Sequence, residues 1–364
     1  MGLITKRINN HHRIFLGILI AFSWAIFVAS RMTMQDPSDD FTNYYANYQD
    51  LCNGNYGALF EYAKGLELGV PLLFLLLSFI SKELSPNLLI FYITLISALL
   101  LLIWMEGNLF ELMDNKLKGI AGAYVWVMAS FFMASQSVRQ YLAMIILLYA
   151  ISSNDKLKKL LILFLASTFH LIAIPIYLIV EGIKKYKWKA TISALIVILI
   201  FYFLYDIIYV TFGDNFPILN KLEYYHNNTD GFTEVDLNFL KIFSVPLLFL
   251  LYRILLDRHL IILNDPLAII YLSFYLFYIA MFPFPLLSIR FTLIINSIIL
   301  GLFCFSFLKN YVQHLIFLLI FLIIPWRIRS IVNIDPNNSM AYWSIYPQSS
   351  IYPVYYYIKM LNNY

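Results

Sequence analysis

Long apolar stretches alternate with short polar ones along almost the whole chain. A helix that spans a bilayer needs about 20 apolar residues, so this pattern indicates a series of membrane helices. The eleven apolar segments are 14–30, 70–81, 87–105, 119–137, 138–152, 160–180, 190–212, 239–256, 260–282, 286–308 and 311–325. We predict an all-α fold, namely a polytopic integral membrane protein with about 9–11 transmembrane helices and room for re-entrant segments. One integral membrane domain is expected to take up residues 1–364.

Composition supports this class and argues against several others. Hydrophobic residues make up 61% of the chain and charged residues only 13%, whereas soluble domains have roughly 25% charged residues. The net charge of +4 is spread over many loops, which argues for membrane orientation and against nucleic-acid binding. Cys52 falls in a polar loop and Cys304 in an apolar segment. We therefore expect no disulfide, no metal site and no cofactor.

The first apolar segment follows Lys6, Arg7 and Arg13, as the apolar part of a signal peptide would. No cleavage site made of small residues follows it, and the chain continues with Arg31-Met-Thr-Met instead. We expect this segment to be retained as the first membrane helix.

Charge in the loops predicts which ends of the helices face outward. Twelve of the 21 acidic residues fall in 31–69 and 206–238, which we expect to be outer loops. Lysines gather at 156–159 and 184–189, as they do in cytoplasmic loops. These assignments cannot all hold if every apolar segment crosses the membrane. Four segments then separate the outer loop 31–69 from the inner loop 156–159, and one separates 156–159 from the inner loop 184–189, so each pair of loops would lie on the wrong sides.

Two arrangements repair this count. In one, 156–159 lies outside and Arg139 is near the cytoplasmic face. In the other, the 12-residue segment 70–81 and the segment 160–180, which contains Pro175, are re-entrant. We favour the second arrangement, because it places Arg139 and Arg290 on the same outer side and implies a cavity that satisfies the re-entrant backbone.

Arg139 and Arg290 are the only formally charged residues within 119–154 and 266–308. A guanidinium deep in a bilayer costs roughly 2.5–3.5 kcal/mol on insertion scales, so such a residue usually faces a polar cavity or an anion. The alternative is that each side chain reaches the headgroups from near a helix end.

Acidic and tyrosine side chains alternate between the first two apolar segments. The residues are Asp36, Asp39, Asp40, Tyr44, Tyr45, Tyr48, Tyr56, Tyr62 and Glu67. Carboxylates accept hydrogen bonds from sugar hydroxyls and aromatic rings cover the apolar faces of sugars, so this stretch suits carbohydrate. An ordinary solvated loop with a helix cap at Asp39 or Asp40 is the alternative.

Polar residues inside the later segments suggest a phosphate site. If the helix is continuous, Gln136, Arg139 and Gln140 share one face and present donors that match phosphate oxygens. His170 lies among apolar residues, where it is either a hydrogen-bonded interhelical donor or a proton acceptor in the same cavity.

The C-terminal stretch 326–364 is rich in aromatic residues. Such residues commonly form a belt at the membrane interface, and a stacking surface for sugar rings is the alternative.

The order of these motifs resembles the EpsG-type and Wzy-type polymerases of exopolysaccharide and O-antigen repeat units. The shared pattern is an acidic, tyrosine-containing loop after the first helix, a glutamate before the second, Arg-Gln followed by Leu-Ala, and Phe-His about 30 residues later. Carried over position by position, it covers Asp40, Tyr44, Glu67, Arg139, Gln140 and His170. The chain departs from the pattern where Leu68-Gly69 follows the glutamate in place of a Pro-Gly turn.

The resemblance implies that a growing polysaccharide is transferred from undecaprenyl pyrophosphate to a new lipid-linked repeat unit. The expected place is the outer face of a bacterial inner membrane, with a chain-length regulator and a flippase as candidate partners. The alternatives are a flippase or transporter of lipid-linked oligosaccharide and another lipid-sugar glycosyltransferase or ligase.

We assign provisional roles for this reaction. The pyrophosphate would bind Arg139, Gln140 and Arg290, and sugars would bind Tyr44 and Tyr45. The base for the acceptor hydroxyl would be one of Asp39, Asp40, Glu67 and His170, with Asp39 or Asp40 as first choice.

Overall fold

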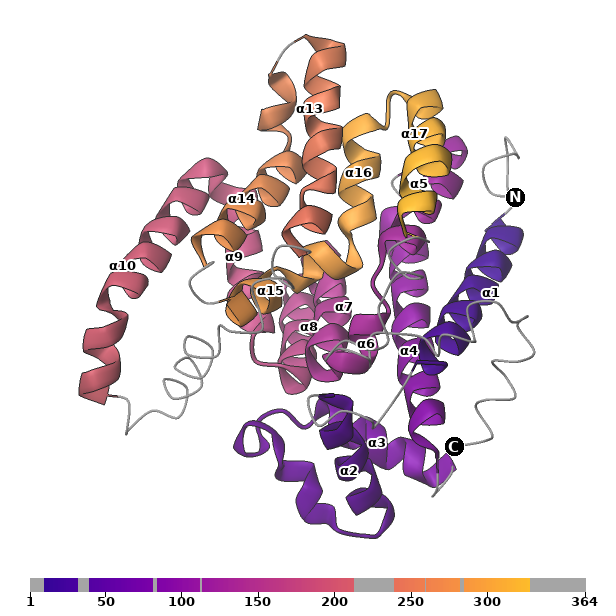
Figure 1. Cartoon of the computed structure of the whole chain (residues 1–364), viewed down its shortest axis with the longest axis vertical. Coiled ribbons are helices and arrows are strands. Elements are labelled where there is room, and N and C mark those ends of the chain that lie inside the picture. The colour runs from indigo at the N-terminus through magenta and orange to yellow at the C-terminus, as the bar shows by residue number, and fades with distance from the viewer. Residues whose placement is uncertain are drawn as a thin grey trace. The chain divides into compact units, whose positions relative to one another are not determined.

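Helices form every regular element in the described part of the chain (Figure 1). The computed structural model describes residues 10–31, 39–80, 84–111, 113–212, 239–258, 260–281 and 285–327. The predicted all-α class is confirmed. The predicted outer loop 206–238 lies outside the described residues beyond Phe212, and so does the aromatic stretch beyond Arg327.

The chain divides into two compact units, which we describe separately. The first comprises Met1–Ile174 and Val312–Tyr364, and the second comprises Pro175–Tyr311. Arg139 belongs to the first unit and Arg290 to the second. The assignment of the whole chain to one membrane domain stays a prediction.

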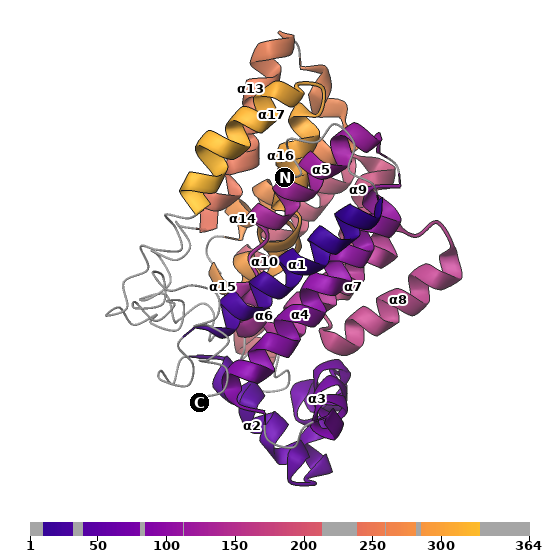
Figure 2. The same cartoon turned by 90° about the vertical axis from the view of Figure 1, so that its right-hand side faces the viewer.

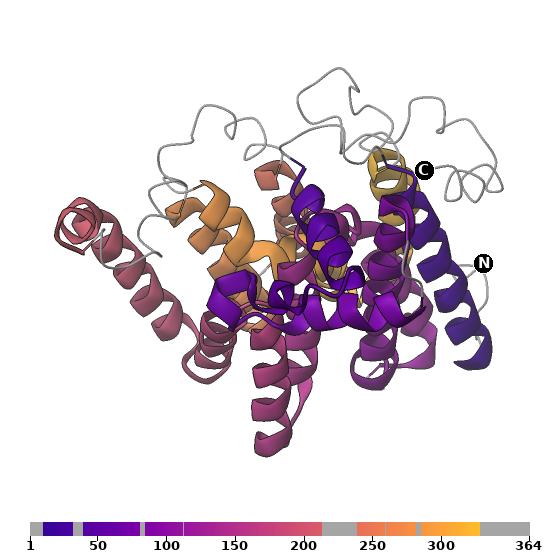
Figure 3. The ribbon, with the colours of Figure 1, turned by 90° about the horizontal axis from the view of Figure 1, so that it is seen from below.

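The first unit holds the N-terminal helices and the last one. Its elements are α1 (Asn10–Ala29), α2 (Phe41–Cys52), η1 (Tyr56–Phe60), η2 (Tyr62–Gly65), α3 (Gly69–Ile80), α4 (Pro86–Trp104) with a π-helical extension η3 (Met105–Leu109), α5 (Asn115–Met128), α6 (Phe132–Gln136), α7 (Val138–Ser152), α8 (Lys156–Phe169), α17 (Val312–Leu318) and η7 (Leu319–Ile323). Figure 2 shows α1 and α4 running side by side, and Figure 3 shows α2 lying against α3. Helices α7 and α8 also pack together.

Local sequence explains where several of these helices begin. The Ser85 side chain accepts a hydrogen bond from the Leu88 amide, and Pro86 occupies the first helical position of α4, where no amide donor is needed. Asp155 caps α8 by accepting from the Leu157 and Lys158 amides at 2.8 and 3.2 Å.

The expected outer loop 31–69 contains more regular structure than a solvated loop. It holds α2, η1 and η2, and Cys52 is the last residue of α2. Helix α2 buries Tyr44, Asn47 and Tyr48, since it packs on α3. The predicted apolar segment 70–81 is α3, whose 12 residues are too few to cross a bilayer as a straight helix.

The predicted segment 119–137 is not one helix. Helix α5 ends at Met128, Ala129 is extended (φ −63°, ψ 133°), and the chain resumes as the short helix α6. A second break follows at Ser137 (φ −114°, ψ 51°), so α6 and α7 are separate. The expectation that Gln136, Arg139 and Gln140 share one continuous helical face is therefore wrong for Gln136.

The predicted segment 160–180 is also broken, but not at its proline. Helix α8 ends at Phe169 and α9 (Ala173–Tyr186) begins after a short turn. Pro175 lies in the first turn of α9, where a missing amide donor costs nothing because no acceptor precedes it in the helix. The break therefore falls at His170 and its two successors.

The second unit contains the remaining helices. They are most of α9, then α10 (Trp188–Phe212), α13 (Val245–Asp257), η5 (Ile261–Asn264), α14 (Pro266–Ala280), α15 (Pro285–Leu293), π-helical η6 (Ile294–Ile298) and α16 (Leu300–Leu308). Helix α13 packs on α16, and a buried hydrogen bond of 2.6 Å between the Thr191 and Ser273 hydroxyls joins α10 to α14. These two buried hydroxyls thus find partners between helices, as a membrane interior favours.

Several helices have the length and composition of membrane spans. Within the described residues, three qualify: Asn10–Ala29, Pro86–Leu109 and Phe239–Asp257. A fourth is the pair Leu287–Ile298 and Leu300–Leu308, which is bent by 56°. Shorter apolar helices such as α3 also leave large apolar side chains uncovered, including Phe79 at 76% exposure. Such surfaces suit lipid, which supports a membrane protein.

Candidate functional site

Arg139 is the centre of a polar cluster at the start of α7. The helix begins at Val138, directly after the break at Ser137, so Arg139 lies in its first turn. The Nη1 atom of Arg139 pairs with Oε2 of Glu67, and its Nε donates to the Tyr44 hydroxyl at 3.4 Å. The guanidinium also lies over the Tyr62 ring, 4.3 Å from its centroid. The side chain of Arg139 keeps 20% exposure, so the cluster is accessible.

A sharp turn brings Tyr62 and Glu67 to the same guanidinium. Ala63, Lys64 and Gly65 all have positive φ, at 49°, 55° and 85°. Residues other than glycine rarely adopt this left-handed backbone conformation, which costs them roughly 1–3 kcal/mol each. The surrounding contacts therefore hold this turn in place, and it reverses the chain between the aromatic ring and the carboxylate.

Glu67 joins Arg139 to the break between α8 and α9. While Oε2 pairs with Arg139, Oε1 accepts from the Leu171 amide at 3.0 Å and lies 3.1 Å from Nδ1 of His170. The Glu67 side chain is only 4% exposed. One carboxylate thus connects residues from a loop, the start of α7 and the turn before α9.

Neighbouring donors keep Glu67 ionised. Burial alone would raise the pKa of Glu67, but the hydrogen bond and charge of His170, the charge of Arg139 and the Leu171 amide outweigh it and lower that pKa to about 2. Because the pKa falls from an ordinary 4.5, the stabilisation is fully present above that value and is lost as the pH drops towards 2. A carboxylate this acidic is a poor proton acceptor near neutral pH.

The partners of His170 decide which ring nitrogen is basic. Its Nδ1 lies 3.1 Å from Glu67 and 3.3 Å from the Ile172 amide, and it cannot donate to the first and accept from the second at once. Since Glu67 is ionised and closer, we assign the proton to Nδ1, which donates to the carboxylate. The basic nitrogen of the imidazole is then Nε2.

Gly69 permits the close approach that this cluster needs. A Cβ atom at Gly69 would lie 2.5, 2.6 and 2.9 Å from three atoms of the Phe169 ring. Phe169 directly precedes His170, so this contact sets the distance between the Glu67 loop and the end of α8. The chain therefore departs from the Pro-Gly pattern only at Leu68 and keeps the glycine on which this packing depends.

We expect Gly69→Ala to destabilise the protein by about 1–3 kcal/mol, as overpacking of a tight contact usually does. Thermal unfolding of the purified variant would measure this loss. Gly107→Ala is the matched control, because nothing lies within 4 Å of a Cβ atom at Gly107. Equal unfolding temperatures for the two variants would show that the contact between Gly69 and Phe169 is not tight.

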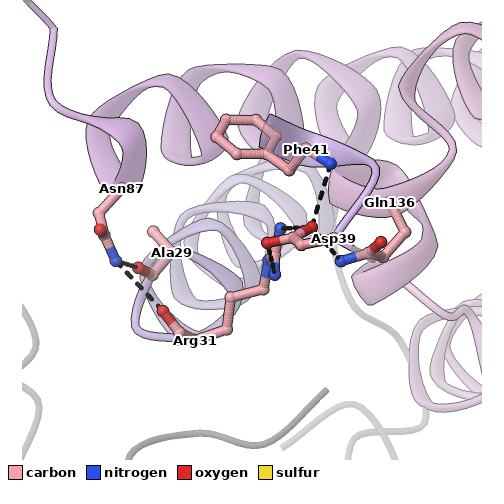
Figure 4. A network of polar contacts seen from close by, with 6 residues as sticks. All are labelled: Ala29, Arg31, Asp39, Phe41, Asn87 and Gln136. Atoms are coloured by element: carbon pink, nitrogen blue, oxygen red, sulfur yellow. Dashed lines mark hydrogen bonds and ion pairs between the residues drawn. The ribbon is translucent and has the colours of Figure 1, made fainter. Parts of the chain in front are cut away.

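Asp39 and Tyr45, two other predicted site residues, have hydrogen-bond partners outside this cluster. Asp39 is fully buried in an ion pair with Arg31 (Figure 4), whereas the neighbouring Asp40 is exposed. The Tyr45 hydroxyl donates to the Leu84 carbonyl at 3.1 Å. Gln140 is 3% exposed within α7.

Arg290 lies in α15, in the second unit. Its predicted part in pyrophosphate binding stays a prediction.

Two residues of functional interest were not singled out from the sequence. Arg31 has no exposed surface and neutralises Asp39, and Tyr62 stacks on Arg139. A signal for Arg31 existed, since it ends a long apolar segment and a carboxylate follows eight positions later. No local signal marked Tyr62 among the other tyrosines of the loop.

Comparison with known proteins agrees with the motif-level resemblance. A family model described as the EpsG family matches residues 13–344, which include the whole Arg139 cluster. No curated protein and no solved structure matches the chain. Because the match extends over nearly the entire sequence, the chain belongs to the EpsG family, a membership that supports a polysaccharide-polymerase type of role.

Proposed function

We propose that this protein joins undecaprenyl-pyrophosphate-linked oligosaccharide repeat units into O-antigen or exopolysaccharide by glycosyl transfer. The reaction would take place at the outer face of a bacterial inner membrane. The observation that carries the proposal is the Glu67 carboxylate, which holds an arginine and a histidine from separate elements in one accessible cluster. Such a cluster has both a cation for a phosphate and an imidazole for proton transfer.

Arg139 is suited to the pyrophosphate leaving group. As the bond from the anomeric carbon to the pyrophosphate oxygen breaks, negative charge grows on that oxygen, and a guanidinium can stabilise it. The buried Tyr62 hydroxyl beside it has no hydrogen-bond partner in the described residues, and it can donate to a phosphate oxygen. Burial raises the pKa of Tyr62, so this hydroxyl keeps its proton. Gln140 is a further proposed contact for the pyrophosphate.

His170 is suited to be the base. The acceptor hydroxyl oxygen attacks the anomeric carbon, its proton passes to Nε2 of His170, and the bonding electrons leave with the pyrophosphate. Glu67 would orient the imidazole through Nδ1 and stabilise its protonated form. Tyr44 lies beside Arg139 and would contact the sugar next to the pyrophosphate, with Tyr45 farther along α2. The exposed Asp40 is the alternative base.

Gene disruption tests the function against its rivals. The test uses a strain that attaches its repeat units to a lipid-bound core oligosaccharide. On a glycan gel, loss of a polymerase should then show cores that carry a single repeat unit. Loss of a flippase should leave cores without repeat units, and loss of a ligase should leave polymer on the carrier lipid. Either of the last two patterns would contradict the proposal.

The pH dependence of the rate should identify the base. Glu67→Gln is expected to lower the rate by roughly 10²-fold or more, since general bases contribute 10²–10⁴-fold and this variant loses the orienting carboxylate. The acidic limb of the pH–rate profile should also move to lower pH than in the wild type. Without the carboxylate, the protonated form of the His170 imidazole is less favoured. Initial rates with lipid-linked repeat units from pH 5 to pH 9 measure both effects. An acidic limb that disappears in Glu67→Gln but persists in His170→Gln would make Glu67 itself the base.

A further inference from the structure

A second polar network lies next to the Arg139 cluster, around the buried carboxylate of Asp39. Oδ2 and Oδ1 of Asp39 accept from Nη1 and Nη2 of Arg31 at 3.1 and 3.2 Å, and both side chains have 0% exposure. Oδ1 also accepts from the Phe41 amide at 3.0 Å and from Nε2 of Gln136 at 2.8 Å. Figure 4 shows these donors converging on one carboxylate from three segments of the chain.

Two of these donors lead directly to the Arg139 cluster. Gln136 is the last residue of α6, so its bond to Asp39 fixes the chain just before the break at Ser137 and the start of α7. Arg139 follows two residues after that break. The position of its backbone therefore depends on where Gln136 is held.

The Phe41 amide gives the second connection. Phe41 is the first residue of α2, and Tyr44 lies one turn farther along that helix. The Tyr44 hydroxyl accepts from Nε of Arg139, which closes a ring of contacts from Asp39 through α2 to Arg139 and back through Gln136. One carboxylate thus fixes both the guanidinium and the phenol that contacts it.

We propose that Asp39 is a positioning residue for the anion site, acting through Gln136 on Arg139 and through α2 on Tyr44. The proposal rests on the proposed function, in which Arg139 binds pyrophosphate. Asp39 is not the base, because its two oxygens are occupied by four donor groups and its charge balances Arg31 in a site without exposure. Acceptance of a proton there would leave the Arg31 charge uncompensated.

Asn87 supplies a matched control within the same network. Its Nδ2 donates to the carbonyls of Ala29 at 2.5 Å and Arg31 at 3.3 Å, which ties α4 to the end of α1. Asn87 is 2% exposed and Gln136 is 6% exposed, so both are buried amides. Gln136 lies three residues before Arg139 in the chain, whereas Asn87 belongs to α4.

The test removes Gln136 rather than Asp39, because Asp39 variants would leave Arg31 buried without its counter-charge. Gln136→Met and Asn87→Leu are purified in lipid nanodiscs, and inorganic pyrophosphate is the probe of the anion site. We expect Gln136→Met to bind pyrophosphate about tenfold to hundredfold more weakly, the scale of loss that a misplaced binding group causes. Asn87→Leu should bind pyrophosphate within about twofold of the wild type, even where its unfolding temperature falls. Asn87 lies on α4 and not in the segment that carries Arg139, and changes at separate sites rarely couple.

Turnover with lipid-linked repeat units adds a second readout. Gln136→Met should raise KM more than it lowers kcat, with the wild-type pH profile, since it displaces the anion site without removing a base. Binding is measured at a temperature where all variants are folded.

Three results would each contradict a different part of the proposal. Wild-type pyrophosphate affinity in Gln136→Met, together with lost affinity in Arg139→Gln, overturns the positioning role and leaves the anion site intact. Equal weakening in Gln136→Met and Asn87→Leu also overturns that role, because the effect would then be general. Wild-type affinity in Arg139→Gln overturns the proposed function of Arg139 itself.

Discussion

Asp39→Asn should destabilise the protein by about 3–5 kcal/mol, because it removes the carboxylate charge that pairs with the fully buried Arg31. The asparagine side chain has nearly the same shape, so the loss would come from the charge rather than from packing. Thermal unfolding of the purified protein and its amount in membranes would both show the effect. This is the largest stability change that we expect from a single substitution in the chain.

Asp50→Asn is the matched control for this prediction. Asp50 lies near the other end of α2 and is exposed, so its variant should stay within about 0.5 kcal/mol of the wild type. Combining Asp39→Asn with Arg31→Met should recover much of the lost stability, since both charges of this ion pair are then removed together. Wild-type unfolding of Asp39→Asn alone would show that the ion pair does not hold the end of α1 to α2.

Arg139→Lys should lower polymerisation by roughly 10²–10³-fold, the usual cost of losing one donor that stabilises a developing anion. Lysine keeps the charge and can still pair with Glu67. It cannot also donate to the Tyr44 hydroxyl from a fixed planar group that stacks on Tyr62. Initial rates with lipid-linked repeat units, and the ladder of polymer lengths on a glycan gel, measure the loss.

The Arg139→Lys variant should accumulate in membranes like the wild type, so that lost activity is not lost protein. Arg258→Lys is the control, because Arg258 is exposed after the end of α13. A full-length polymer ladder from Arg139→Lys would mean that charge alone, or no cation at this position, is needed.

The proposed site gives three residues different parts in one reaction. In the proposed reaction, Arg139 would stabilise the leaving group and His170 would accept the proton, and Glu67 would orient both without titrating near neutral pH. Asp39 bonds to Gln136, three residues before Arg139, and by our proposal it positions that arginine. This division follows from burial and hydrogen bonding, because aspartate, glutamate and histidine side chains could each have served as an acid or a base.

The sequence by itself determined the class of the protein. Apolar runs of membrane length report a local property of the chain, since each helix satisfies its own backbone and needs only an apolar surface to face lipid. The bounds of α7 agree with the predicted segment 138–152, and Ser85-Pro86 marks the start of α4, because capping is also local. Arg139, Glu67 and His170 stood out because charged and titratable residues are rare next to such runs.

Only the tertiary structure decided which of these residues meet. Glu67 and Arg139 are 72 positions apart, and Asp39 and Gln136 are 97 apart, so no local pattern could pair them. The breaks at Ala129 and after Phe169 escaped sequence reasoning, which placed the second one at Pro175. A proline is tolerated in a first turn, whereas a chain leaves the helix where side-chain and backbone groups find better partners elsewhere. At His170 and Leu171 that partner is Glu67, and its position depends on the packing of α2, α3 and α8 together.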